Sequence, residues 1–460
     1  MFSSLLHDMN NLPVSDTRFS YPISTLQQIA RDILQHAQKG GASACETNVS
    51  DGFGQTVTVR QDAVETIEYN RDKGLSVTVY IGQKRGHAST SDFSPQAISD
   101  TVAAALSIAR YTADDDCAGL AEAELLAKNY PSLDLYYPWQ ISVEEAIELA
   151  KRCEQAAYAA DKRITNSEGA TISVSESQFI YANSLGFMGG YPLSRHSISC
   201  AMIAEQGDSK QRDYWYSVAR DAADLETVQS IGEKTGKRSA ARLGARKIGT
   251  CEVPVLFEAP IASGLIGHFA SAVSGSNLYR KSSFLLDSIG QQVFAPDIQI
   301  LERPHLHKGL ASGSFDDDGV ATVDRNIVEN GIVQGYFLGS YSARKLGMRT
   351  TGNAGGAHNL IMRNGTAMSF DAMLKQMGTG LLVTELLGHG INAVTGDYSR
   401  GASGFWVENG AISYPVEEIT IAGNLKDMFR NIAAIGNDVI VRGSKQCGSV
   451  LINRMTVAGG

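Results

Sequence analysis

Hydrophobic and polar positions alternate with two distinct periods near the N-terminus of the chain. Residues 25–39 are predicted to form an amphipathic helix, because apolar side chains recur every three or four positions, at Leu26, Ile29, Ile33, Leu34 and Ala37. Residues 55–60 and 75–81 instead alternate with a period of two, as half-buried strands do, and the glycines of residues 82–86 indicate a hairpin turn. These patterns predict a sheet that packs against a helix.

Two further helices are predicted on either side of an acidic segment. Residues 94–111 are rich in alanine, and Pro95 stands in the first turn, where its missing N–H costs no hydrogen bond. Residues 112–138 are acidic and alanine-rich, and we interpret them as a linker. Ser142 and Glu145 have the spacing of a capping box, which predicts that a helix begins there.

The middle of the chain predicts an antiparallel sheet. Residues 171–221 alternate strongly, and the short polar segments at residues 183–186 and 206–207 fit hairpin turns. Another helix is expected over residues 224–243. Beyond about residue 250, glycine becomes frequent and the apolar runs shorten, which is typical of many short strands joined by tight turns.

These elements predict an α+β fold. The N-terminal part is expected to be mixed α/β with helices on a sheet, and the C-terminal part to be rich in short antiparallel strands. A length of 460 residues suffices for two or three domains. We expect an N-terminal α/β domain over residues 1–115, a central region of a helix and antiparallel strands over residues 116–245, and a glycine-rich, β-rich domain over residues 246–460.

Composition and charge exclude several classes of protein. With 43% hydrophobic and 19% charged residues, the chain has a globular rather than a disordered composition. The net charge of −9 argues against nucleic acid as the main partner, because phosphate binding requires a basic surface. No stretch has the length of an uncharged membrane span, so no membrane partner is expected.

Cysteine usage and the first residues of the chain indicate a cytoplasmic location. The six cysteines are widely scattered and include no CxxC pair, as expected for free thiols in a reducing compartment. Residues 1–16 lack the basic region and the sustained apolar core of a secretory signal peptide. We therefore expect a cytoplasmic protein.

Residues 253–275 have the arrangement of a metallopeptidase helix without its chemistry. A strand of buried type, residues 253–257, leads through Pro260 into a helix that carries a single histidine, His268. A zinc peptidase helix needs two histidines to hold the metal and a glutamate to deprotonate the bound water. This helix therefore has one histidine instead of two and no glutamate, so by itself it lacks the residues that such a reaction requires.

Six long and unusual strings carry a family resemblance: residues 91–98, 160–169, 278–290, 339–347, 395–410 and 418–429. Through them the chain resembles the TldD/PmbA family of bacterial proteases, in particular its PmbA (TldE) branch, over nearly its whole length. The resemblance implies how a complete site is built. In the TldD branch the helix carries His-Glu, three further residues and a second His, and a cysteine near the C-terminus completes the zinc site.

Set against that pattern, this chain keeps two of the three ligand positions and loses the general base. Ser263 and Gly264 stand where the family has its first histidine and its glutamate, so no residue of this chain is expected to be catalytic. His268 and Cys447 match the other two ligand positions as remnant metal ligands. Because catalytic zinc sites use three protein ligands, we expect these two to be packed side chains instead of a working metal site.

The family spacing also makes a prediction about helix geometry. Two histidines five positions apart do not share a face on a regular helix, where neighbours lie three or four apart. The parent site must therefore distort its helix locally, and Gly267 would ease such a turn in this chain.

The resemblance implies a subunit of a TldD-type metalloprotease complex that degrades or processes extended, unfolded peptides, with roles in peptide-antibiotic maturation and antitoxin turnover. Zinc and the catalytic glutamate would belong to the TldD-type partner, and this chain would bind no cofactor. Two alternatives stay open. One is an autonomous peptidase in which Cys447, as a thiolate, attacks the substrate with help from His268. The other is a non-enzymatic peptide-binding regulator.

Overall fold

The computed structural model describes residues 18–459, so the prediction about a signal peptide in residues 1–16 lies outside the described residues. The helices are α1 Ile23–Lys39, α2 Pro95–Tyr111, α3 Val143–Ala160, α4 Val228–Ala241, α5 Ala259–Ala272, α6 Gly275–Tyr279, α7 Ser340–Lys345, α8 Phe370–Met377 and α9 Leu425–Arg430. No helix within the described range is long and apolar enough to cross a lipid bilayer.

The strands of the first half are β1 Ala44–Arg60, β2 Ala63–Ile81, β3 Lys84–Thr90, β4 Ile164–Asn183, β5 Met188–Gly189, β6 Pro192–Gln206 and β7 Ser209–Ala219. Those of the second half are β8 Cys251–Phe257, β9 Gln299–Glu302, β10 Arg325–Glu329, β11 Ile332–Val333, β12 Leu360–Arg363, β13 Gly380–Leu387, β14 Asp397–Glu408, β15 Ala411–Asn424, β16 Ile432–Ile435, β17 Lys445–Gln446 and β18 Val450–Gly459. Helices and sheets are thus mixed along the chain, and the predicted α+β class is confirmed.

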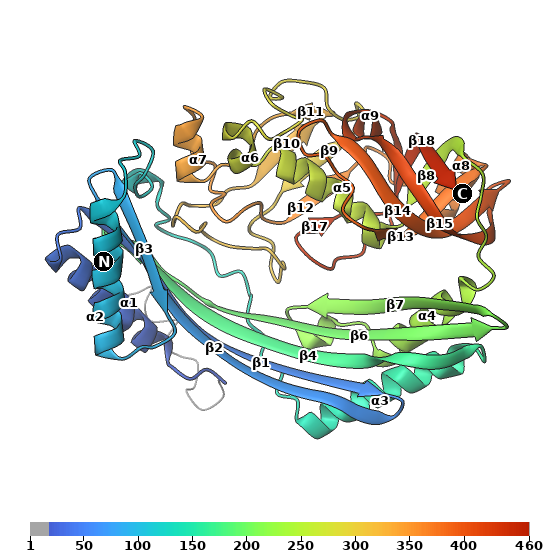
Figure 1. Cartoon of the computed structure of the whole chain (residues 1–460), viewed down its shortest axis with the longest axis horizontal. Coiled ribbons are helices and arrows are strands. Elements are labelled where there is room, and N and C mark those ends of the chain that lie inside the picture. The colour runs from blue at the N-terminus through green and yellow to red at the C-terminus, as the bar shows by residue number, and fades with distance from the viewer. Residues whose placement is uncertain (1–17, 460) are drawn as a thin grey trace.

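A long, curved antiparallel sheet spans the first half of the molecule (Figure 1). Its strand order is β3-β2-β1-β4-β6-β7, with β5 paired to β4. The strands predicted over residues 55–60 and 75–81 are only the ends of β1 and β2, which run for 17 and 19 residues. The predicted N-terminal domain, residues 1–115, and the predicted central region, residues 116–245, therefore contribute strands to one sheet. The domain boundary at residue 115 stays a prediction.

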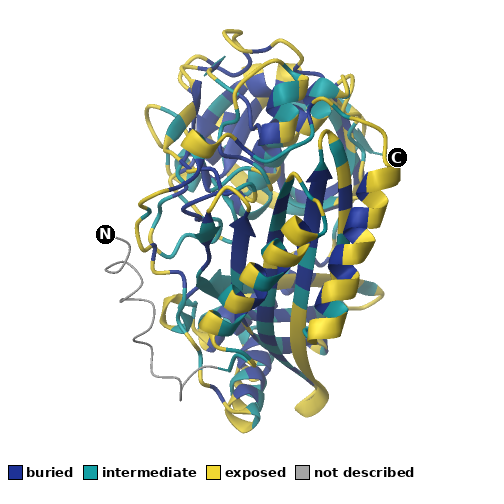
Figure 2. Cartoon of the chain, turned by 90° about the vertical axis from the view of Figure 1, so that its left-hand side faces the viewer, coloured by how far each residue is buried: buried dark blue, intermediate teal, exposed yellow. Residues whose placement is uncertain are grey.

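One face of this sheet is covered by helices at both ends. Val49 of β1 packs in the core below α1 and α2, whereas Val57 on the same face of β1 belongs to the core below α3 and α4. Figure 2, seen from the side of α1 and α2, shows exposed helix stripes outside buried strands. On the opposite face, hydroxyl groups pair across β1 and β4, Thr56 with Ser173 at 3.2 Å and Thr58 with Thr171 at 3.0 Å.

Most helices begin where local signals predict. α1 buries the predicted apolar stripe, and α2 begins at Pro95. α3 begins with the predicted capping box, in which Ser142 and Glu145 bond each other's backbone N–H groups. α4 is shorter than predicted, because residues up to Asp224 form a separate 3-10 turn and the helix starts after Thr227.

The predicted linker is packed against the second half of the chain. It contains one short 3-10 turn, Ala123–Leu125, and its leucines Leu126, Leu133 and Leu135 are buried. Leu126 forms an antiparallel bridge with Val320. The segment therefore fixes the two halves of the molecule to each other.

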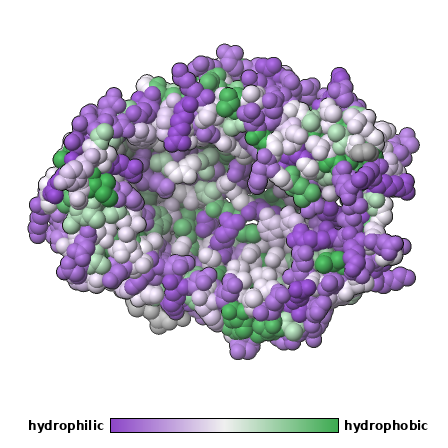
Figure 3. Space-filling model, viewed as in Figure 1, coloured by the Kyte–Doolittle hydropathy of each residue, from purple (hydrophilic) through white to green (hydrophobic). Residues whose placement is uncertain are grey.

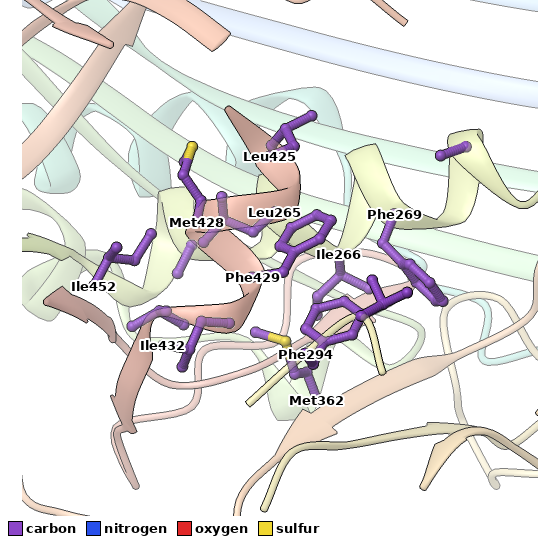
Figure 4. Packing of buried hydrophobic residues seen from close by; sticks show 14 of the residues in the cluster. Leu265, Ile266, Phe269, Phe294, Met362, Leu425, Met428, Phe429, Ile432 and Ile452 are labelled. Atoms are coloured by element: carbon purple, nitrogen blue, oxygen red, sulfur yellow. The ribbon is translucent and has the colours of Figure 1, made fainter. Parts of the chain in front are cut away.

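The second half contains two further sheets around one core. A six-stranded sheet has the order β15-β14-β13-β8-β18-β16, with β8 and β13 parallel, and a five-stranded sheet has the order β11-β10-β9-β12-β17. Side chains from both sheets, α5 and α9 join in a single apolar cluster (Figure 4). Phe294 stacks on Phe429 with ring centroids 4.5 Å apart, and Phe269 of α5 meets Phe294 edge-on at 5.0 Å.

Replacing Gly236 on α4 with alanine is expected to lower the free energy of unfolding by about 1–3 kcal/mol. A Cβ atom at this position would lie 2.4 Å from the Ala157 carbonyl oxygen of α3, so the two helices would have to separate. Chemical denaturation measures the loss. Gly264→Ala is the matched control, because a Cβ atom there meets nothing within 4 Å and alanine has the higher helix propensity. An equal loss in both variants would contradict the packing explanation.

Candidate functional site

The start of α5 is fixed by segments from both halves of the molecule. Ala259 donates its backbone N–H to Ser449 Oγ at 3.0 Å, and this hydroxyl donates to Asp438 at 2.6 Å. Glu258, directly before the helix, accepts two hydrogen bonds from Arg238 of α4, at 2.6 and 3.0 Å. The helix that resembles the family's zinc helix is therefore held in a defined position at the junction of the two halves.

α5 has one buried face and one open face. The buried face packs into the apolar cluster through Ala262, Leu265, Ile266 and Phe269. Gly264 is exposed, and Ser263, Gly267 and His268 are half-buried; we call these four residues the open face of α5. The helix is α-helical from Ala259 to Ala272, so the local distortion expected of the parent site is not present here.

Ser263 and Gly264, which are predicted to stand at the family's first-histidine and glutamate positions, are accessible. Ser263 donates its hydroxyl to the Pro260 carbonyl oxygen at 3.3 Å, within the same helix. A Cβ atom at Gly264 would meet no atom within 4 Å, so packing does not prevent a longer side chain there. The fold would therefore accommodate a longer side chain at Gly264, and the replacement of a general base at this position stays a prediction from residue type.

His268 is a half-buried, neutral imidazole. Its ring lies edge-on to that of Tyr398, with centroids 5.9 Å apart and 73° between the planes. Burial lowers the pKa of His268, and the positive charges of Arg400 and Lys445 lower it further. Since the ordinary pKa of histidine is about 6.5, the ring is uncharged at neutral pH.

Cys447 is buried and protonated. Its side chain is 1% exposed within the apolar cluster. Burial raises the pKa of the Cys447 thiol to about 12, and the nearby charge of Asp438 acts in the same direction. A cysteine nucleophile must be a thiolate, so this environment disfavours the alternative of a Cys447/His268 peptidase.

The donor set of residues 18–459 does not fit a catalytic zinc site that uses His268 and Cys447. Within residues 18–459, the three-residue group able to share one ion is Asp115, Asp116 and Cys117, in the packed linker, and Lys345 already neutralises Asp115 at 2.8 Å. His268 and Cys447 belong to no such group in that range. A catalytic zinc needs three protein ligands. The assignment of these two residues as remnant ligands stays a prediction.

The structure adds Lys445 to the site and places Arg400, a residue of a family string without an assigned partner, beside it. Arg400 on β14 and Lys445 on β17 both lie close enough to His268 to lower its pKa. A Cβ atom built at Gly267 would lie 3.3 Å from Lys445 Cε, so the lysine side chain runs along α5. Arg400 is part of a family string, but no spacing rule connects residues 268, 400 and 445.

Three family profiles match the chain in consecutive order. The PmbA/TldA metallopeptidase domain 1 matches residues 45–109, the PmbA/TldA metallopeptidase central domain matches residues 136–243, and the PmbA/TldA metallopeptidase C-terminal domain matches residues 250–459. The C-terminal match contains α5, β14 and β17, and therefore the whole candidate site.

Individual proteins show the same relationship. The chain is 52% identical over 420 residues to Metalloprotease PmbA of Escherichia coli, covering 91% of this chain and 93% of that protein. It is 49% identical over 434 residues to the Metalloprotease PmbA homolog of Haemophilus influenzae, covering 94% and 96%. It is 25% identical over 321 residues, 65% of each chain, to the Metalloprotease TldD homolog of the same organism.

A solved structure supports the fold over nearly the whole length. The crystal structure of a Bacteroides thetaiotaomicron protein described as a modulator of DNA gyrase superposes with a TM-score of 0.89, at 27% identity over 94% of this chain and 99% of that chain. The profiles, the relatives and the fold agree. The chain therefore belongs to the PmbA/TldD metallopeptidase family, in its PmbA (TldE) branch.

Proposed function

We propose that this chain is the non-catalytic subunit of a TldD-type metalloprotease complex that degrades or processes unfolded peptides. The observation that carries the proposal is the open face of α5. Ser263 and Gly264 stand where the family has a ligand and a base, although a Cβ atom at Gly264 would be free of contacts. Residues that could neither hold zinc nor accept a proton thus occupy an accessible position.

In this proposal the zinc and the general base belong to a TldD-type partner, and this chain binds no cofactor. Haemophilus influenzae has both a PmbA homolog and a TldD homolog, which supports a system of two related proteins. The heteromer would be cytoplasmic, and peptide-antibiotic maturation and antitoxin turnover are its proposed roles.

The contribution of this chain would be to enclose and orient the peptide. Figure 3 shows a hollow between the long sheet and the second half of the molecule. α5 and β17 lie on the side of the second half that faces the long sheet (Figure 1). The face of the sheet without helices carries the paired hydroxyls of β1 and β4. Extended peptides of varied sequence suit such a surface, because main-chain hydrogen bonds can provide most of their affinity.

A reconstitution experiment tests the proposal. The chain and a TldD-type partner are purified separately, and hydrolysis of an unstructured peptide is measured for each protein and for the mixture. We expect no hydrolysis by this chain alone and hydrolysis by the mixture, which is lost when the glutamate of the partner's helix is replaced by glutamine. Metal-dependent hydrolysis by this chain alone would refute the proposal. Peptide binding without hydrolysis in any mixture would favour the regulator.

The zinc content of the isolated chain is an independent prediction. Elemental mass spectrometry on tag-free protein, purified with zinc present and then dialysed, is expected to find much less than one zinc per chain. The reason is that His268 and Cys447 share no third ligand within residues 18–459. One tightly held zinc per chain, lost in His268→Ala, would contradict this expectation. It would favour the hypothesis that this chain is itself a protease.

A further inference from the structure

Two positively charged side chains beside the open face of α5 lack a negative partner. Lys445 lies against α5, because a Cβ atom at Gly267 would lie 3.3 Å from Lys445 Cε. Arg400 stands two residues after Tyr398 on β14 and therefore on the same face of the strand, and the Tyr398 ring lies edge-on to that of His268. Neither cation forms an ion pair within residues 18–459. Arg400 Nε is buried and has no hydrogen-bond acceptor. Burial raises the pKa of Tyr398 to about 12, so the neighbouring phenol supplies no negative charge. An unpaired cation in such a position is costly unless a ligand supplies the negative charge.

The carboxylates of the neighbouring elements are already engaged. Glu258, at the start of α5, binds Arg238 at 2.6 Å. Glu385 of β13 binds Arg242 at 2.5 Å, and Asp438 accepts the hydroxyl and the backbone N–H of Ser449. Within residues 18–459, no carboxylate forms an ion pair with Arg400 or Lys445.

The surface beside these cations is shaped for a peptide backbone. The open face of α5 carries small side chains, Ser263 and Gly264, beside the imidazole, and the Lys445 side chain lies against Gly267 one turn further on. A main chain can therefore approach the helix closely at Gly264. A Cβ atom at Gly264 would meet nothing within 4 Å, which shows that the space above the helix is free. A planar guanidinium binds a carboxylate through two parallel hydrogen bonds, and a lysine adds a movable point charge.

We propose that Arg400 and Lys445 form a carboxylate-binding site on the open face of α5, which holds a carboxylate of a bound peptide. The inference rests on the proposed function in that it takes a peptide as the ligand. The carboxylate is either the C-terminal group of the peptide or an aspartate or glutamate side chain. In the family's zinc helix the corresponding position carries out hydrolysis. In this chain the proposed site would orient the substrate.

Binding to the isolated full chain tests this site apart from any hydrolysis. A fluorescently labelled, unstructured peptide is titrated by anisotropy in three forms: with a free C-terminus, with a C-terminal amide, and with the amide and one internal glutamate. We expect at least one carboxylate form to bind about tenfold more tightly than the plain amide, as charge-assisted hydrogen bonds allow. The form that binds identifies the source of the carboxylate.

Substitutions identify the side chains that cause the preference for a carboxylate. Arg400→Gln should reduce the affinity of the carboxylate form to that of the amide, and Lys445→Gln should reduce it in part. Arg400→Lys, which keeps the charge without the planar fork, should give an intermediate affinity and guards against a folding defect in Arg400→Gln. Lys375→Gln removes an exposed cation from α8 and is the matched control, with no change expected. Thermal melting confirms that each variant is folded.

Equal binding of all three peptides, absence of binding, or a carboxylate preference that survives in folded Arg400→Gln would overturn the proposal. None of these results would refute the proposed function, because hydrolysis by the reconstituted mixture tests that proposal separately.

Discussion

Phe429→Ala is expected to lower the free energy of unfolding by about 3–5 kcal/mol, as truncation of a fully buried aromatic ring does. Phe429 is 0% exposed, on α9, and its ring stacks on Phe294 with centroids 4.5 Å apart. It also meets the edge of Phe269 on α5 at 6.4 Å. Removing the ring leaves a cavity at the point where α5, α9 and the strands of two sheets meet (Figure 4).

Urea denaturation of the purified chain measures this loss. Tyr111→Ala is the matched control, because that aromatic ring is 90% exposed and its removal should change stability by less than about 0.5 kcal/mol. Phe429→Leu should lose less than Phe429→Ala, since part of the volume is kept. If Phe429→Ala were as stable as the control, the cluster around α5 would not be the tightly packed core that the ring contacts indicate.

The second large effect concerns pH. The contribution of Asp316 to stability is expected to fall as the pH rises from about 4 to about 7, by up to roughly 4 kcal/mol. Asp316 is 3% exposed in the turn before Val320. Burial raises the pKa of its carboxyl group to about 7, and the charge of Asp318 adds to the effect. Hydrogen bonds from the backbone N–H groups of Ala354 and Val320 offset part of it.

The direction of the change follows from proton binding. The ordinary pKa of Asp316 is 3.8, so the folded protein keeps a proton that the unfolded chain releases. This stabilising contribution is complete below about pH 4 and is lost as the pH rises through about 7. Burial also raises the pKa values of Asp317 and Glu46, so these groups act in the same direction. Asp115 and Asp161, whose pKa values are lowered to about 2, lose their stabilising contributions only at more acidic pH.

Asp316→Asn should therefore reduce the slope of stability against pH by about 1.4 kcal/mol per pH unit between about pH 5 and 6.5. Urea midpoints at several pH values measure the slope, which is informative even if the variant is less stable at every pH. Asp72→Asn, at an exposed aspartate of β2, is the control and should leave the slope unchanged. A slope equal to that of the unsubstituted protein would show that Asp316 is ionised in the folded state.

Local signals in the sequence predicted the features that depend on near neighbours. The apolar stripe of α1, Pro95 at the start of α2 and the capping box of α3 each specify one helix, because the groups that satisfy them lie within four residues. The sequence underestimated β1 and β2, since residues 63–73 of β2 are exposed and show no alternation of buried and exposed positions. Pairing with β1 holds them in the sheet.

For the candidate site, too, some features follow from the sequence and others only from the tertiary structure. The prediction that Ser263 and Gly264 replace a ligand and a base depends on residue types, so it comes from the sequence alone. Only the tertiary structure decided what surrounds His268. It brings together α5, β14 and β17, which are far apart in the chain, and leaves Arg400 and Lys445 beside the helix without an acidic partner within residues 18–459. Charge balance and burial depend on which strands become neighbours, and no local pattern encodes that pairing.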